Sequence, residues 1–378
     1  MNNNGNMHWA SVWGNAISIS TNHVASYAKN ITLRYPIFTR FGGSAMKLTF
    51  DNYCGLEDVT LTKVTVLIGG EFLKVKFSGN ESVTIPAGEN VVSDALECDI
   101  KPDSEFTVSI YFGDYTHMRS GVAAKGPLSK ALYAIGDMTE TEDISIDISR
   151  EISMFYFLSN ISVYTSKENR TVICYGDSIT AQDWPDYLTL RCGDEGFKNT
   201  AIIRRAASGT RILREYNCIT YESYGLMGTK RFEHEVPTEG ADTVIIQQGI
   251  NDIIHPVGTD VNPFRPMSDL PTVEEMIEGL KYYIEKARSY GYKVYVGTLL
   301  PIEGWRTYAP FRDELRTAYN DWIRTTDLID GCIDFDKAVW DENNHRAFDK
   351  KYNSGDSLHP SKEGYKAMAN AVPAEILK

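Results

Sequence analysis

The chain has 378 residues, which exceeds the roughly 250–300 residues at which a single hydrophobic core stops growing, so we expect two domains. Apolar residues make up 42% of the chain and charged residues 24%, a composition that excludes a largely disordered or collagen-like protein. The 51 acidic residues outnumber the 38 basic ones and give a net charge of −13, and the sequence has no block of Lys or Arg. We therefore expect neither a nucleic-acid partner nor a membrane partner.

Residues 1–28 do not have the pattern of an export signal. They contain no Lys or Arg and no apolar stretch of about 7–15 residues, so we expect a cytoplasmic location. No apolar run in the chain reaches the roughly 18–20 residues that a membrane span requires. The six cysteines include no C-x-x-C pair, which argues against a zinc site. We expect no metal and no cofactor.

Residues 1–166 have the pattern of an all-β domain. From about residue 9, short alternating or β-branched runs are separated by turn residues such as Gly69-Gly70 and Gly79-Asn80, and no long helical pattern interrupts them. The runs predict strands at Met46–Phe50, Thr60–Ile68, Phe72–Phe77, Ser82–Ile85 and Phe106–Phe112. We expect a jelly-roll-like sandwich, joined to the rest of the chain through the polar stretch 166–170.

Residues 171–378 follow a different pattern, in which short apolar strands alternate with helices. Strands are predicted at Thr171–Tyr175, Thr243–Gln247, Lys293–Leu300 and Gly331–Phe335. The segment Thr272–Tyr290 carries apolar residues at three- and four-residue steps and begins with a capping box of Thr272 and Glu275, and 311–325 predicts a second helix. The alternation predicts an α/β domain with a parallel sheet between helices. In such sheets the ligand site lies beyond the carboxyl ends of the strands.

The first candidate residue is Ser178. It lies in Gly176-Asp177-Ser178-Ile179-Thr180, directly after the first predicted strand of the second domain. Glycine permits a tight turn there, and the start of a helix would offer backbone N–H groups to a developing negative charge. This is a suitable position for a nucleophile. A simple helix cap formed by Asp177 or Ser178 explains the pentapeptide equally well.

A carboxylate and an imidazole follow near the end of the chain, in Asp356-Ser357-Leu358-His359-Pro360. Their spacing allows Asp356 to accept the Nδ1 proton of His359 while Nε2 faces outward, which is the arrangement of a general base. A surface histidine on a loop remains the alternative, because loops commonly carry polar residues.

Two further positions could bind an oxyanion. Asn251, in Gly249-Ile250-Asn251-Asp252, follows a predicted strand and could aim its side-chain amide at such an anion. Gly209, in Ala206-Ala207-Ser208-Gly209-Thr210, follows another and could present a backbone N–H to the same point. Turns rich in Gly, Asn and Asp are common, so an ordinary turn is the alternative for the Asn251 segment.

Together, the four blocks around Ser178, Gly209, Asn251 and His359 resemble the SGNH/GDSL hydrolase superfamily, in which Ser, Gly, Asn and His blocks occur in this order. Residues 84–112 look like the β-domain of the two-domain esterase branch. The resemblance implies a flavodoxin-like three-layer catalytic domain at 171–378. It also implies that Ser178 attacks an ester, that Asp356 and His359 activate it, and that the N–H groups of Ser178 and Gly209 and the Asn251 amide form the oxyanion hole. Ile179 stands where the family usually has Leu.

The substrate is the least determined part of this interpretation. The superfamily acts on lipids, small esters and acetylated sugars. We expect an esterase for small acyl groups, above all acetyl groups, on xylan or oligosaccharides, because the sequence has no long apolar loop that could form a lipase acyl channel. A lipase or a short-chain carboxylesterase is the alternative. Aromatic residues on predicted loops that could stack on sugar rings, or simply pack, are Trp184, Trp305, Tyr308 and Trp340.

The β-domain has its own open alternatives. It could be a separate carbohydrate-binding or assembly module, and Trp9 and Trp13, which precede its first clear strand, could serve either purpose. We expect a homo-oligomer, because a sandwich has strand edges that a second copy could cover.

Overall fold

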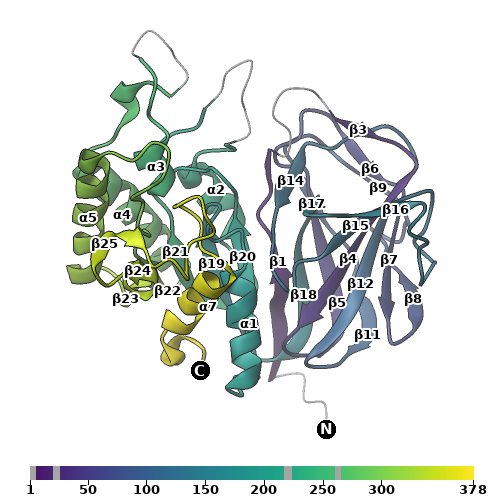
Figure 1. Ribbon diagram of the computed structural model, residues 1–378. Helices are drawn as coiled ribbons and strands as arrows, with labels where there is room; N and C mark the ends of the chain where they lie inside the picture. Colours follow the sequence, from purple (N-terminus) through teal and green to yellow (C-terminus); the bar gives the residue numbers. More distant parts are fainter. Residues whose placement is uncertain (1–5, 20–25, 217–223, 260–264) are drawn as a thin grey trace. The chain divides into compact units, whose positions relative to one another are not determined.

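The computed structural model of the protein describes residues 6–19, 26–216, 224–259 and 265–378. The chain divides into two compact units, which are considered separately below (Figure 1). The first unit consists of Met1–Thr171, Cys192–Arg204 and Thr238–Gly240, and the second of Val172–Arg191, Arg205–Pro237 and Ala241–Lys378.

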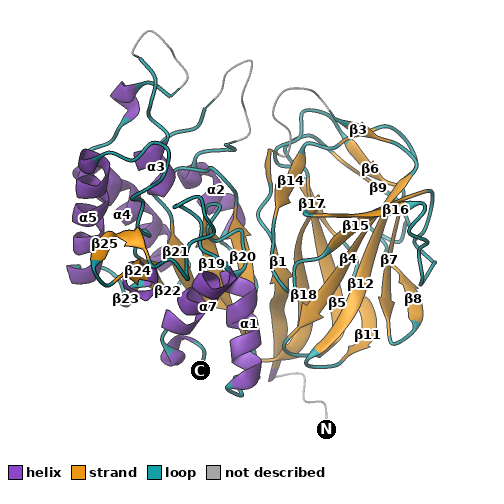
Figure 2. Ribbon diagram, in the orientation of Figure 1, coloured by secondary structure: helices purple, strands orange, loops and turns teal. Residues whose placement is uncertain are grey.

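The first unit is built from strands, and no α-helix occurs among its described residues up to Thr171 (Figure 2). The strands are β1 (Met7–Gly14), β2 (Ser18–Ile19), β3 (Tyr27–Ala28), β4 (Ile31–Thr39), β5 (Gly43–Asp51), β6 (Val59–Leu61), β7 (Lys63–Ile68), β8 (Glu71–Lys74), β9 (Val83–Ile85), β10 (Asn90–Val92), β11 (Leu96–Ile100), β12 (Ser104–Phe112), β13 (Thr116–His117), β14 (Ser120–Ala123), β15 (Ala131–Ile135), β16 (Ser149–Ile152), β17 (Met154–Tyr156) and β18 (Leu158–Ser166). The predicted all-β character of this region is confirmed.

Two larger antiparallel sheets dominate this unit. One has the strand order β1-β18-β5-β10, with β11 also paired to β5, and the other has the order β16-β15-β4-β12-β7-β8. Their core follows the two-residue period of a strand, because alternate side chains point to the same face. In β4, for example, Leu33, Tyr35 and Ile37 are all buried. The predicted strand at 72–77 ends at Lys74, and 60–68 forms two strands that Thr62 separates.

The chain from Arg170 onward contains the expected parallel sheet and its helices, most of which belong to the second unit, although Cys192–Arg204 and Thr238–Gly240 are assigned to the first. Its elements are β19 (Arg170–Gly176), α1 (Trp184–Asp194), β20 (Thr200–Ala206), α2 (Gly228–Glu235), β21 (Ala241–Gln247), α3 (Ile250–Ile254), α4 (Val273–Ser289), β22 (Lys293–Gly297), α5 (Pro310–Thr325), β23 (Gly331–Ile333), α6 (Phe335–Val339), β24 (Trp340–Asp341), β25 (Asn344–Phe348) and α7 (Lys362–Ala371), with short 3-10 turns at Met267–Asp269 and Ala374–Ile376. Among them, no described helix is long and apolar enough to cross a membrane.

The strand order of the sheet is β20-β19-β21-β22-β23, which in chain order reads 2-1-3-4-5. The pairs β21–β22 and β22–β23 are parallel. This is the order of a flavodoxin-like sheet, and the predicted fold class is confirmed. The direction of the connections reverses between β19 and β21, so the carboxyl ends of these two strands form the edge at which ligands bind in such folds.

Local signals explain several element boundaries of this unit. The predicted capping box of α4 is present, since the Thr272 hydroxyl accepts from the Glu275 N–H at 3.2 Å and the Glu275 carboxylate accepts from the Thr272 N–H at 2.9 Å. Two predicted strands are too long. β22 ends at Gly297, and two residues further on the Leu299 N–H donates to the Asn320 side chain at 2.8 Å. β23 ends at Ile333 because Asp334 caps α6 by accepting from the Lys337 N–H.

Candidate active site

Ser178 follows β19 at the reversal point of the sheet. β19 is buried throughout from Thr171 and ends at Gly176, where a β-carbon would lie 2.3 Å from the carbonyl oxygen of Gln247. Only glycine fits this close approach to β21, so the chain can turn directly after the strand. The turn is held by the Asp177 carboxylate, which accepts from the Ile179 N–H at 3.1 Å. Ser178 itself remains partly exposed while both of its neighbours are buried.

Ser178 is joined to His359 and Asp356 by a continuous chain of hydrogen bonds. Its Oγ lies 2.9 Å from Nε2 of His359, and Nδ1 of His359 lies 2.7 Å from Oδ2 of Asp356. A carboxylate at Nδ1 selects the tautomer that carries its proton there, which leaves Nε2 free to accept from the serine hydroxyl. The structure therefore brings these three predicted residues together in the order that proton transfer requires.

The turn around Asp356 fixes both the carboxylate and the imidazole. Oδ1 of Asp356 accepts from the backbone N–H groups of Leu358 at 2.9 Å and His359 at 2.8 Å, while Oδ2 faces the imidazole. Burial would raise the pKa of Asp356, but these hydrogen bonds hold it below its ordinary value. Ser357 lies between them with a φ of +61°, and its N–H donates to Oδ1 of Asn353 at 3.0 Å. Asp356 is therefore held as a charged acceptor.

Gly209 and Asn251 also come together. Gly209 follows β20 with a φ of +78°, and Nδ2 of Asn251, in the first turn of α3, donates to the carbonyl oxygen of Thr210 at 3.1 Å. This bond uses one of the two N–H groups of the amide. The Ala207 N–H donates to the carbonyl oxygen of Gly176 at 3.2 Å, so this segment is tied to the end of the strand that precedes Ser178.

Two buried carboxylates beside these residues, Asp177 and Asp252, were not among the predicted site residues. Asp252 accepts from the backbone N–H groups of Ile212 at 2.9 Å and Leu213 at 3.0 Å and so anchors the segment after Gly209. Burial raises the pKa of Asp252 and raises that of Asp177 to about 7. Oδ2 of Asp177 has no hydrogen-bond partner within the described part of the chain. Their position inside the Ser and Asn blocks is the signal that could have identified them.

The aromatic candidates divide into packing residues and residues near the site. The prediction that Trp184 lies on a loop is wrong, because it begins α1, is fully buried and packs against Phe335 with ring centroids 5.3 Å apart. Trp340 stacks on His345 at 3.8 Å in the hairpin of β24 and β25. Trp305 and Tyr308 are partly exposed on the loop after β22.

That loop lies against the turn that carries the imidazole. A β-carbon on Gly304 would lie 2.7 Å from Oγ of Ser357. The loop therefore packs directly on Ser357, which lies between Asp356 and His359 in the sequence. The Thr307 hydroxyl donates to the carbonyl oxygen of Ile254 at 3.0 Å, which ties the same loop to the end of α3. The loop that carries Trp305 and Tyr308 therefore packs against the His359 turn through Gly304 and against the end of α3 through Thr307.

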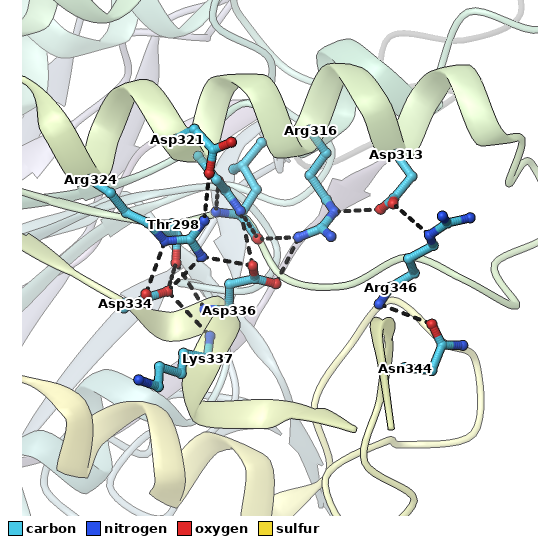
Figure 3. Close-up of polar contacts among 12 residues, drawn as sticks. Thr298, Asp313, Arg316, Asp321, Arg324, Asp334, Asp336, Lys337, Asn344 and Arg346 are labelled. Atoms are coloured by element: carbon cyan, nitrogen blue, oxygen red, sulfur yellow. Dashed lines mark hydrogen bonds and ion pairs between the residues drawn. The ribbon is translucent and has the colours of Figure 1, made fainter. Parts of the chain in front are cut away.

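A buried network of charges supports the strand that leads into this loop (Figure 3). Arg316 donates to Asp313 at 2.9 Å, to Asp336 at 2.7 Å and to the carbonyl oxygen of Leu299 at 3.1 Å. Arg324 binds both oxygens of Asp334, at 3.0 and 2.9 Å. Asp334 and Asp336 lie near the strand ends, yet arginines hold both of them. Within the described ranges, no group of three His, Cys, Asp or Glu residues is placed to hold a metal ion.

Comparison with known proteins gives one family match and a set of related structures. The model of the GDSL-like lipase/acylhydrolase family matches residues 174–367, which include Ser178, Gly209, Asn251, Asp356 and His359. No curated protein matches the sequence.

Three solved structures illustrate the structural matches. A GDSL-like lipase from Bacteroides thetaiotaomicron is 20% identical, with 56% of this chain and 88% of that chain covered and a TM-score of 0.38. A lipase/acylhydrolase from Enterococcus faecalis is 21% identical, with 55% and 95% covered and a TM-score of 0.41. A variant of the acetyl xylan esterase Axe2 from Geobacillus stearothermophilus is 17% identical, with 56% and 96% covered and a TM-score of 0.41.

Proposed function

Because the chain belongs to the GDSL-like lipase/acylhydrolase family, we propose that it is a serine esterase that removes small acyl groups, above all acetyl groups, from carbohydrates such as acetylated xylan or oligosaccharides. The hydrogen-bonded series Ser178–His359–Asp356 is the observation that carries this proposal. Nε2 of His359 faces the serine hydroxyl, while Asp356 holds the opposite ring nitrogen. This is the geometry of an activated nucleophile.

The proposed reaction has two halves. His359 accepts the proton of Ser178 as Oγ attacks the ester carbonyl, and then gives this proton to the leaving alcohol. Water next attacks the acyl-enzyme while His359 accepts a proton from it, and the bond from Oγ to the acyl carbon then breaks. The acid is released, and His359 returns the proton to Oγ of Ser178. In both tetrahedral intermediates the oxyanion accepts from the N–H groups of Ser178 and Gly209 and from the Asn251 amide. The Thr210 carbonyl supports this role for Asn251, because it fixes the amide beside Gly209.

The aromatic side chains around the site favour a sugar ester over an ester with a long acyl chain. Tyr224 packs against Gly209, and the loop that carries Trp305 and Tyr308 packs against the His359 turn. Aromatic rings with a polar edge suit the mixed apolar and hydroxyl surface of a sugar, whereas a fatty acyl chain requires an apolar channel. A lipase or general short-chain carboxylesterase is the alternative.

One assay tests the proposal. Release of acetate from acetylated xylan is compared with hydrolysis of p-nitrophenyl palmitate, with Ser178→Ala as the control for each substrate. We expect faster, Ser178-dependent release of acetate. If palmitate is the better substrate, the protein is a lipase, and if Ser178→Ala retains activity, the proposed nucleophile is wrong.

For the β-domain, a role in binding or assembly remains a second proposal. Trp9 and Trp13 lie within β1, not before the first strand. The ring of Trp9 packs on Tyr164 at 5.5 Å and that of Trp13 on Phe155 at 5.8 Å, yet both remain partly exposed. Retained affinity of Ser178→Ala for unmodified xylan, lost on Trp9→Ala, would support a binding role. Light scattering tests the predicted homo-oligomer, which a mass of 42.5 kDa in solution would contradict.

A further inference from the structure

A group of cationic and aromatic side chains lies beside the proposed oxyanion hole. We name it the arginine–tyrosine cluster, and it consists of Arg211, Tyr216, Tyr224, His255, Arg265 and Arg306. A β-carbon on Gly209 would lie 2.3 Å from Cδ1 of Tyr224, so the tyrosine ring packs directly on this glycine. The same ring stacks on His255 with centroids 4.2 Å apart. His255 follows Asn251 by one helical turn, and its N–H donates to the Asn251 carbonyl oxygen at 3.2 Å.

Arg211 places its guanidinium group in a buried position beside Tyr216. The residue is only 1% exposed, and its guanidinium lies 3.3 Å from the centroid of the Tyr216 ring. Neither Nε nor Nη2 has a hydrogen-bond partner among the residues that the structure describes. Burial lowers the pKa of Arg211, but a guanidinium keeps its proton in proteins. Two buried guanidinium nitrogens without hydrogen bonds are costly, and a ligand that accepts from them would remove this cost.

Two more arginines add positive charge around the same histidine. Arg265 is partly exposed, donates to the Tyr224 hydroxyl at 3.2 Å and has a φ of +58°, a backbone conformation that is unfavourable for a residue with a side chain. Arg306 is exposed on the loop that borders the His359 turn. Burial, together with the charges of Arg211, Arg265 and Arg306, lowers the pKa of His255 well below its ordinary value. His255 is therefore neutral and adds no charge to the cluster.

The carboxylates near Arg211 are already engaged elsewhere. Asp252, Asp269 and Glu215 are acidic residues of the described chain whose charges act on it, and Glu215 pairs with Lys230 at 2.7 Å. Both oxygens of Asp252 accept backbone N–H groups, and Asp269 lies 3.5 Å from the Arg214 guanidinium. Among the described residues, the charges that act on His255 are those of arginines, although the chain as a whole has a net charge of −13.

We propose that the arginine–tyrosine cluster binds a carboxylate carried by the ester substrate, so that the enzyme selects acidic esters over neutral ones. This inference rests on the proposed esterase function. Guanidinium groups match the planar geometry of a carboxylate, and an anion that accepts from the buried Arg211 would compensate its charge. Because Tyr224 lies against Gly209, the carboxylate would sit a few atoms from the ester carbonyl. Such a group can belong to the alcohol, as in a uronic acid, or to the acyl part, as in a dicarboxylic monoester.

The test compares pairs of substrates that differ in one carboxylate. In the first arm, an acetylated methyl glucuronoside is compared with the acetylated methyl glucoside. In the second, mono-p-nitrophenyl succinate is compared with p-nitrophenyl butyrate. We expect kcat/KM to favour the acidic member about tenfold or more in one arm, which identifies the part of the substrate that bears the charge. Added salt should reduce this preference, because it screens the attraction.

Variants separate recognition from folding. Arg265→Gln and Arg306→Gln should each lower the acidic-to-neutral ratio of kcat/KM severalfold. Arg288 lies on α4 and pairs with Asp330. Arg288→Gln removes this arginine and should leave the ratio and the rate unchanged. Equal rates on both members of each pair, or equal loss on acidic and neutral esters in the cluster variants, would overturn the inference while Ser178-dependent hydrolysis of neutral esters continues. Lack of Ser178-dependent hydrolysis of every ester would instead refute the proposed function.

Discussion

The Oγ atom of Ser178 lies 2.9 Å from Nε2 of His359, although the two residues are 181 positions apart in the chain. Ser178 leaves the end of a buried strand, while His359 lies on a turn that its own neighbour Asp356 organises through backbone and side-chain hydrogen bonds. One partner is therefore positioned by the sheet and the other by a local turn. Substitutions can therefore change the position of Ser178 and the position of His359 separately.

Replacing Ser178 should remove the chemistry without unfolding the protein. Ser178→Ala should abolish hydrolysis of p-nitrophenyl acetate, because no nucleophile remains, and should change the free energy of unfolding by less than about 1 kcal/mol, because the residue is partly exposed. Esterase assays and urea denaturation measure the two effects. Ser289→Ala, at the exposed end of α4, is the matched control and should retain full activity. Residual Ser178→Ala activity above background would contradict the assignment.

The pH dependence of the reaction should report the imidazole. His359 accepts the serine proton only when it is neutral, so kcat/KM should rise as the solution becomes less acidic. Because the pKa of Asp356 is lowered, its carboxylate stays charged across this rise and does not produce it. Asp356→Asn should lower kcat by about 10³–10⁴-fold, since the wrong tautomer then faces Ser178. An activity that is flat from acid to neutral pH would exclude a histidine base.

Asn251 should act on the transition state. Asn251→Ala should lower kcat by about 10²–10³-fold with little change in KM, because an oxyanion donor binds the developing charge more strongly than the ground state. Steady-state kinetics on a soluble acetyl ester separate the two constants. Asn343→Ala, in the exposed turn between β24 and β25, is the control. A large rise in KM at constant kcat would instead assign Asn251 to substrate binding.

Asp177 should make stability depend on pH. Its pKa is raised to about 7 by burial, so between about pH 4 and 7 the folded state holds a proton that the unfolded state has lost. Stability should fall as the pH rises through this range, by up to about 4 kcal/mol. The side chain of Asp177→Asn cannot ionise. The free energy of unfolding of this variant, relative to that of the parent protein, should therefore be higher at pH 8 than at pH 4. Denaturant unfolding at both pH values measures this difference, and an equal effect at both would contradict the buried, protonated carboxyl.

Arg316 should contribute to stability through the carboxylates it neutralises. Arg316→Met leaves Asp313 and Asp336 buried without this partner, so unfolding should become easier by about 3–5 kcal/mol. Arg288→Gln breaks a partly exposed pair with Asp330 and should cost less than about 1 kcal/mol. Urea midpoints compare the two variants. A similar small loss in both would mean that the network around Arg316 adds little stability.

Local signals in the sequence were sufficient for much of the fold. The apolar spacing and the capping box of Thr272 and Glu275 located α4 to within a residue at each end, because both signals act within one or two helical turns. The strand predicted at 293–300 was too long because its end depends on a residue that is distant in the chain. The Leu299 N–H donates to Oδ1 of Asn320 at 2.8 Å, a partner on a distant helix that no local pattern reveals. The loop prediction for Trp184 failed for the same reason, because its packing partner Phe335 is also distant in the chain.

By itself, the sequence determined the alternation of strands and helices, and it indicated Ser178, Asp356 and His359 as candidate site residues, because turn chemistry and the Asp-x-x-His spacing are local properties of the chain. Only the tertiary structure decided that Ser178 meets His359 and that Asn251 meets the segment after Gly209, because these contacts depend on strand order. The same holds for the arginine–tyrosine cluster. Its members come from separate loops, and the burial of Arg211 without a partner arises only when those loops pack together.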